Sequence, residues 1–101
     1  MSHYELTDPA LQDMNEIANY IAEDNVEAAV SLMVALRQRC AALSQHPGMG
    51  RIRKQIGKNV RSVTEGNFVI FYRVQSSHLI QILRIIHAKR DLGKVVFVDL
   101  E

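Results

Sequence analysis

The stretch from His46 to Asp91 reads HPGMGRIRKQIGKNVRSVTEGNFVIFYRVQSSHLIQILRIIHAKRD, and it decides the fold. It begins with a proline-glycine turn and a basic segment, and it continues with three runs rich in β-branched and aromatic residues. Polar and glycine-containing residues separate these runs, as turns separate strands. We therefore expect three strands, over residues 60–64, 68–74 and 79–86, joined by short turns into an antiparallel meander.

The basic segment Arg51–Lys58 precedes the first of these runs and shows no regular apolar periodicity, so we expect it to be irregular and exposed. The second and third runs are apolar at nearly every position, which is typical of central strands. Cations are nevertheless spread through this most apolar part of the chain. That combination predicts a core sheet with a charged surface.

Two helical patterns come before the turn. Thr7-Asp8-Pro9 is a strong helix start, because a capping side chain is followed by proline at the first helical position. Apolar residues at helical spacing then continue to about Glu23. Asn25 predicts the next cap, and the second helix is expected over residues 26–44, where the proline that follows prevents continuation. A short link between two helices favours an antiparallel hairpin.

The predicted fold class is α+β: an N-terminal helical hairpin packed on a small, mostly antiparallel β-sheet, with a short strand at residues 3–6 at an edge. We place Asp13, Glu16 and Glu23 on the polar face of the first helix. The single cysteine, Cys40, falls in the apolar stripe of the second helix, so we interpret it as a buried small hydrophobe.

A chain of 101 residues indicates one domain. We assign residues 1–92 to it and residues 93–101 to a C-terminal tail, whose apolar run has no internal partner that the sequence identifies. The final Leu100-Glu101 is typical of a cloning scar. No apolar run approaches the roughly 20 residues that span a bilayer, and the first residues do not resemble a signal peptide. Cytoplasm is the expected location.

The charge is unevenly distributed although the net charge is only +1. Residues 1–36 contain seven acidic residues and no lysine or arginine, whereas residues 37–94 contain all twelve lysines and arginines and two acidic residues. Such asymmetry predicts a dipolar molecule with a basic face that binds an anionic partner. The alternative is mutual neutralisation between the helical layer and the sheet.

The motifs of metal, phosphate and covalent catalytic sites are missing. None of the four histidines forms an HxH, HxxxH or HExxH spacing, and the sequence contains no CxxC, GxxxxGK[ST], GxGxxG or GxSxG. We therefore expect no metal and no cofactor. The one constellation above background is a set of cations in and around the predicted strands, together with Arg84 and His87 near the end of the last one. Arginine offers a planar fork for phosphate or carboxylate, and histidine transfers protons near neutral pH.

The order of helix, helix, HPGMGRIR, VRSV, GNFVIFYRV and ILRIIHAKRD resembles the ParE/RelE superfamily of toxins from bacterial toxin–antitoxin systems. The resemblance covers roughly residues 3–92 and is most specific in HPxxGRxR and in the GxxVIFYRV strand. Within the superfamily the two blocks look like the ParE branch. The resemblance implies two helices packed on a small antiparallel sheet.

The ParE branch implies a toxin that is not an enzyme and that inhibits DNA gyrase, and hence replication. Its expected partners are gyrase and a ParD-like antitoxin, and it is expected to form a hetero-oligomer with the antitoxin. Operator DNA is contacted only through the antitoxin. The free toxin is expected to be a dimer. No membrane partner is expected. Six cations are the candidate partner-binding residues: Arg51, Arg53, Arg61, Arg73, Lys89 and Arg90.

The RelE branch, a ribosome-dependent mRNA endoribonuclease, is the alternative. Arg90 stands where that branch places a catalytic arginine, and His87 would be its companion. Two departures favour the gyrase inhibitor: Asn67 replaces an arginine that often precedes the strand, and no tyrosine follows Asp91. An inactive module retained for operator regulation is a third interpretation.

Overall fold

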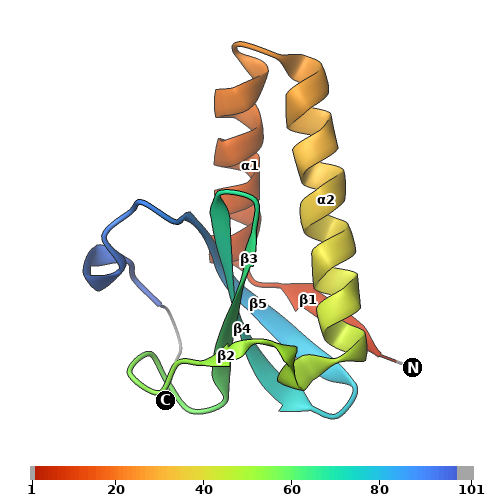
Figure 1. The fold of residues 1–101 in the computed structure, drawn as a ribbon, viewed down its shortest axis with the longest axis vertical. Coiled ribbons are helices and arrows are strands. Elements are labelled where there is room, and N and C mark those ends of the chain that lie inside the picture. The colour runs from red at the N-terminus through yellow and green to blue at the C-terminus, as the bar shows by residue number, and fades with distance from the viewer. Residues whose placement is uncertain (1, 98–101) are drawn as a thin grey trace.

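A two-helix hairpin lies against one face of a five-stranded sheet in the computed structural model, which describes residues 2–97 (Figure 1). The strand order is β1-β5-β4-β3-β2, with β1 parallel to β5 and all other pairs antiparallel. In chain order the elements are β1 His3–Leu6, α1 Asp8–Ala22, α2 Val26–Gln45, the 3₁₀ turn η1 Pro47–Met49, β2 Arg51–Ile52, β3 Val60–Glu65, β4 Phe68–Ser76, β5 Leu79–His87 and the 3₁₀ turn η2 Leu92–Lys94.

The predicted α+β class is confirmed, and so are the hairpin and the edge position of the N-terminal strand. Both predicted helix caps are present. The Thr7 side chain accepts a hydrogen bond from the Ala10 amide at 3.3 Å, and the Asn25 side chain accepts one from the Ala28 amide at 3.0 Å. Within the described residues, neither helix is long and apolar enough to cross a membrane.

Both faces of the sheet carry a hydrophobic cluster. One lies between the sheet and the hairpin and includes the fully buried Met14, Leu36, Ile70 and Tyr72. The other lies on the opposite, helix-free face and is built around Phe71. This two-sided burial explains why the sequence of β4 is apolar at successive positions rather than at alternate ones.

The basic segment after the turn is more regular than expected. The prediction that Arg51–Lys58 is irregular is wrong for its first two residues, which form β2 against β3. The pairing continues by one residue, since the Arg53 amide donates to the Val60 carbonyl at 2.9 Å. A two-residue edge strand is too short to leave a periodic signal in the sequence.

The C-terminal tail finds its partner on the helix-free face of the sheet. Val95 is buried there, and the Phe97 ring lies edge-on to the Phe71 ring with centroids 5.2 Å apart. Figure 1 shows this segment crossing to the side of the sheet away from the hairpin. The predicted scar at Leu100-Glu101 lies outside the described residues.

Helix α1 completes the edge of β5 beyond the end of β1. Strand β1 stops at Leu6, so within residues 2–97 the second half of β5 has no strand beside it on that edge. The Thr7 hydroxyl donates to the Ile82 carbonyl at 2.8 Å, and the Asp13 carboxylate accepts the Ile85 amide at 2.9 Å. Side chains of the helix thus replace a missing strand, which keeps buried backbone groups satisfied.

The same carboxylate binds Arg84 in a two-bond fork, with Nε–Oδ2 at 2.7 Å and Nη2–Oδ1 at 2.8 Å. A third nitrogen of Arg84 donates to the Val96 carbonyl at 2.8 Å. Placing Asp13 on the polar face of the first helix was therefore wrong, because it is only 6% exposed and is satisfied by a residue 71 positions away. The pairing raises the pKa of Arg84.

We predict that Asp13→Ala lowers the free energy of unfolding by about 3–5 kcal/mol, because it leaves a largely buried guanidinium and the Ile85 amide without their acceptor. Glu23→Gln, at the exposed C-terminal end of the same helix, is the control and should change it by less than about 0.5 kcal/mol. Chemical denaturation of both variants measures the difference. Equal stability of the two would contradict the role assigned to Asp13.

Stability should also fall at alkaline pH through Cys40. Burial raises the pKa of its thiol from 9.0 to about 11, so the folded state holds the proton at a pH where the unfolded chain has lost it. As pH rises from 9 to 11, this group should cost the fold roughly 2–3 kcal/mol. Burial also raises the pKa of Tyr72, so the comparison with Cys40→Ala isolates the thiol. Unfolding measured across that pH range should decline less steeply in the variant; parallel curves would refute the assignment.

Candidate functional site

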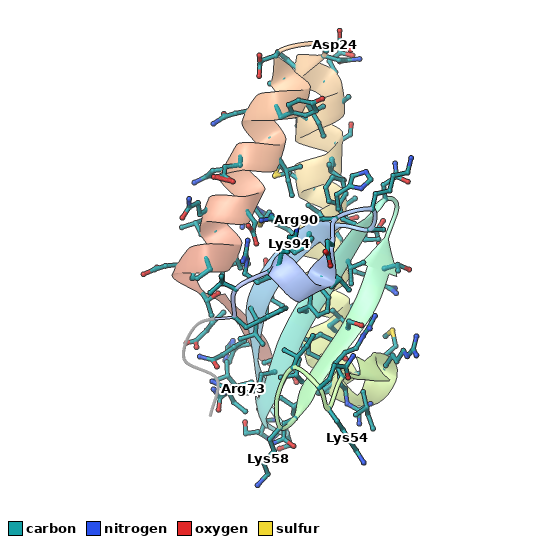
Figure 2. All side chains as sticks on the ribbon, turned by 90° about the vertical axis from the view of Figure 1, so that its left-hand side faces the viewer. Asp24, Lys54, Lys58, Arg73, Arg90 and Lys94 are labelled. Atoms are coloured by element: carbon teal, nitrogen blue, oxygen red, sulfur yellow. The ribbon has the colours of Figure 1, made fainter. Side chains whose placement is uncertain are left out.

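Four of the six predicted partner-binding cations lie together at one end of the sheet, which we call the basic end. It is the end where β3 begins and β4 finishes, because the register pairs Val60 with Arg73. Arg51, Arg53 and Arg61 belong to the same end, since β2 pairs with the first residues of β3. Figure 2 shows Arg73 there, near Lys54 and Lys58.

Lys89 and Arg90 lie at the opposite end. They follow His87, which pairs with Phe68 at the start of β4. A rise of about 3.3 Å per residue separates Phe68 from Arg73 by roughly 17 Å, and Figure 2 shows Arg90 well away from Arg73. The structure therefore does not bring the six cations into one site.

Tyr72 and Arg61 hold the turn between α2 and β2. The buried Tyr72 hydroxyl donates to the Pro47 carbonyl at 2.8 Å and accepts the Gly50 amide at 2.9 Å. Arg61 Nη1 donates to the carbonyls of Gly50 at 2.8 Å and Gly48 at 3.2 Å. A Cβ atom at Gly50 would lie 2.5 Å from the Tyr72 oxygen, so only glycine fits there. These contacts make the turn a rigid part of the sheet.

Arg53 and Arg73 flank Val60 on the helix-free face. Arg53 Nε donates to the Ser62 hydroxyl at 2.7 Å, and its guanidinium lies 5.7 Å from the centre of the Phe71 ring. Arg73 Nη2 donates to Gln81 at 3.1 Å, while its buried Nε has no hydrogen-bond partner within residues 2–97. Arg51 is exposed. Internal bonds thus occupy most of the arginines at the basic end, and Arg51 is free to reach outward.

An open groove of about 800 Å³ opens at the basic end, and we call it the basic groove. Turn η1, strand β2 and the ends of β3 and β4 surround it, together with the loop between β2 and β3. Asn59 in that loop adopts a left-handed backbone conformation with φ 62°. The lining residues are Pro47, Gly48, Ile52, Lys54, Gly57, Lys58, Asn59, Val60, Arg61, Val74, Gln75 and Ser76.

A second groove, the hairpin groove, lies between α1 and α2 and has a volume of about 340 Å³. Its α2 wall includes Val26, Val30 and Val34, which are spaced four residues apart and remain half to two-thirds exposed. Side chains spaced four apart lie on one face of a helix, so the wall is a continuous apolar stripe. Its lining is Ala18, Asn19, Ala22, Val26, Ala29, Val30, Met33, Val34 and Arg37.

Part of the charge is neutralised between the helical layer and the sheet, because each described ion pair joins a helix to a strand. Within residues 2–97, the ion pairs are Asp13–Arg84 and a long Arg39–Glu65 pair at 3.9 Å. Figure 2 shows Asp24 at the tip of the hairpin, at the opposite end from Lys54 and Lys58. No group of three or more metal-ligating side chains occurs in the described part of the chain.

Residues 4–92 match the family model of the ParE toxin of the type II toxin–antitoxin system parDE. The chain belongs to the ParE toxin family. Among solved structures, it is similar to a chain titled "Chromosomal ParDE TA system from P. aeruginosa", with 26% sequence identity and a TM-score of 0.72. That match covers 88% of this chain and 98% of the other. A comparison with curated proteins found no match.

The alternative catalytic pair of this ParE-family toxin is exposed and not preassembled. The His87 ring lies against the Phe68 ring with centroids 5.4 Å apart, and its Nδ1 accepts the Lys89 amide at 3.1 Å. No side-chain hydrogen bond joins His87 to Arg90 within residues 2–97.

Tyr72 and Asp13 are the two important polar groups that sequence reasoning missed. Tyr72 lies in the apolar run of β4, where a buried tyrosine hydroxyl needs a hydrogen-bond partner. The sequence can therefore predict that the Tyr72 hydroxyl is hydrogen-bonded, but it does not identify the residues to which it bonds. For Asp13, helical periodicity predicted an exposed position on the polar face of the helix, whereas the side chain is buried.

We predict that Tyr72→Phe lowers the free energy of unfolding of this toxin by about 1–3 kcal/mol, because the Gly50 amide and the Pro47 carbonyl lose their partner. Tyr20→Phe is the matched control: Tyr20 is 78% exposed on α1, so loss of its hydroxyl should change stability by less than about 0.5 kcal/mol. Denaturant unfolding gives both values. A similar loss in the two variants would argue against a structural role for the Tyr72 hydroxyl.

Proposed function

We propose that this toxin inhibits DNA gyrase in the cytoplasm, that it is not itself an enzyme, and that a ParD-like antitoxin neutralises it. The observation that carries the proposal is the course of the chain after Asp91. Where the RelE nucleases have a tyrosine, this chain turns through η2 and packs Val95 and Phe97 on the sheet. Together with membership of the ParE family, this favours a binding protein over a nuclease.

The hairpin groove is suited to a segment of the antitoxin. Exposed valines along α2 form an apolar stripe. An apolar surface of this kind marks a site of interaction with another molecule. An amphipathic segment that folds on binding would bury it, and a free sheet edge at β1 or β2 offers a second contact. We propose that toxin and antitoxin form a hetero-oligomer through these surfaces, and that the antitoxin alone contacts operator DNA.

We propose that the six candidate cations contribute to partner binding in different ways. Arg51, Lys89 and Arg90 are exposed and can contact a partner directly. Arg53, Arg61 and Arg73 bond to groups within the toxin, so they act by shaping the surface. Charge reversal at Arg51 should therefore weaken partner binding without unfolding the protein.

A purified gyrase assay without ribosomes tests the target. We expect the toxin to block supercoiling or to accumulate cleaved DNA, and we expect added ParD-like antitoxin to restore activity. The rival nuclease would leave gyrase unaffected and would cut mRNA on translating ribosomes. An inactive module would do neither, and its expression without antitoxin would be harmless.

The antitoxin surface has its own test. Val30→Asp and Val34→Asp should each lower antitoxin affinity by about tenfold or more, because a carboxylate would be buried in an apolar contact. Ser31→Asp places the same charge on an exposed residue of the same helix that does not line the groove, and it should have little effect. Titration calorimetry measures all three. Unchanged affinity for the valine variants would exclude the hairpin groove as the interface.

A further inference from the structure

The basic groove carries positive charge that the described protein leaves uncompensated. Lys54 and Lys58 are exposed, and neither forms an ion pair within residues 2–97. Among the described residues, the lining of the groove contains no aspartate or glutamate. The acidic residue at the hairpin tip, Asp24, lies at the far end of the molecule (Figure 2). Nothing described in the chain therefore competes with an anionic partner at this groove.

The groove also has an apolar rim. Ile52, which lines it, is 55% exposed, and Met49 in the adjoining turn is 47% exposed. Val74 and Pro47 add apolar lining. An exposed apolar patch that is rimmed by polar residues marks a site of interaction with another molecule.

The turn that presents this rim is held rigidly. Tyr72 and Arg61 together make four hydrogen bonds to the backbone of residues 47–50. A turn already held in its bound shape loses little entropy when a partner docks, which raises affinity. The network thus preorganises Met49 and the mouth of the groove.

We propose that the basic groove is the docking site for an acidic, partly apolar segment of the toxin's protein target. Lys54 and Lys58 would face its carboxylates, and Ile52 and Met49 would cover its apolar side chains. That the target is gyrase rests on the proposed function. The chemistry of the site does not depend on it.

A protein segment fits this groove better than a nucleic-acid backbone does. Of its three cations, Arg61 is already bound to two carbonyl oxygens, which leaves two lysines for phosphates. Proteins that bind nucleic acid neutralise several phosphates at once, and they offer aromatic platforms to single strands. The described lining contains no aromatic residue.

Three variants and two matched controls test the site in the complete protein. Lys54→Glu and Lys58→Glu should each weaken binding to purified gyrase by about five- to tenfold, because like charges would face each other. Ile52→Ser should weaken it by removing apolar contact. Lys94→Glu makes the same charge reversal in η2, and Val96→Ser removes a 66% exposed valine; both should change affinity by less than about twofold.

Antitoxin binding and unfolding show that each variant is folded. If the groove variants keep their antitoxin affinity and their free energy of unfolding but lose gyrase binding, the inference holds. If they bind gyrase as tightly as the wild type, or lose antitoxin affinity instead, it is overturned. Binding of a labelled DNA duplex to the toxin alone is measured as well. If the toxin binds the duplex tightly and Lys54→Glu and Lys58→Glu abolish that binding, the groove is a nucleic-acid site and the inference is overturned.

Growth arrest separates this inference from the proposed function. If wild-type toxin fails to inhibit gyrase, the proposed function fails, and the variants are then expressed without antitoxin. Loss of arrest with Lys54→Glu and Lys58→Glu, but not with Lys94→Glu, supports the groove as the docking site for another target. Arrest that is equal in all of them overturns the inference.

Discussion

The contact between Asp13 and Arg84 joins three parts of the molecule that would otherwise be independent. The carboxylate comes from α1, the guanidinium from β5, and the remaining donor of that guanidinium holds the backbone of the C-terminal segment. Both charges are nearly buried, so each depends on the other. The hairpin, the sheet and the segment that covers its second face are therefore positioned by one ion pair.

The arginines show how one residue type serves different purposes in a small protein. With about a hundred residues there is little apolar volume for stability, and polar contacts of long reach supplement it. Arg61 holds a turn, Arg53 covers a phenylalanine, and Arg84 bridges layers. Free positive charge at the basic end comes mainly from lysines and Arg51 instead, because their side chains have no internal partner in residues 2–97.

Sequence reasoning predicted the helices, the meander and the edge strand well, because these depend on local periodicity and caps such as Thr7 and Asn25. It grouped six cations in and around the strands as one candidate set, but Lys89 and Arg90 lie at the opposite end of the sheet from the other four. It missed the pairing of Asp13, and it gave no partner for Phe97. Such contacts depend on which segments meet in three dimensions, and local pattern does not encode that.

The parallel pairing of β1 with β5 has a consequence for the timing of folding. Residues of the first strand bond to residues about 75 positions later, so the sheet closes only after almost the whole chain has been synthesised. A partly translated chain lacks the strand that β1 pairs with, and the ion pair that anchors α1 has not yet formed. The complete sheet, and the surfaces built on it, can therefore form only after translation is almost complete.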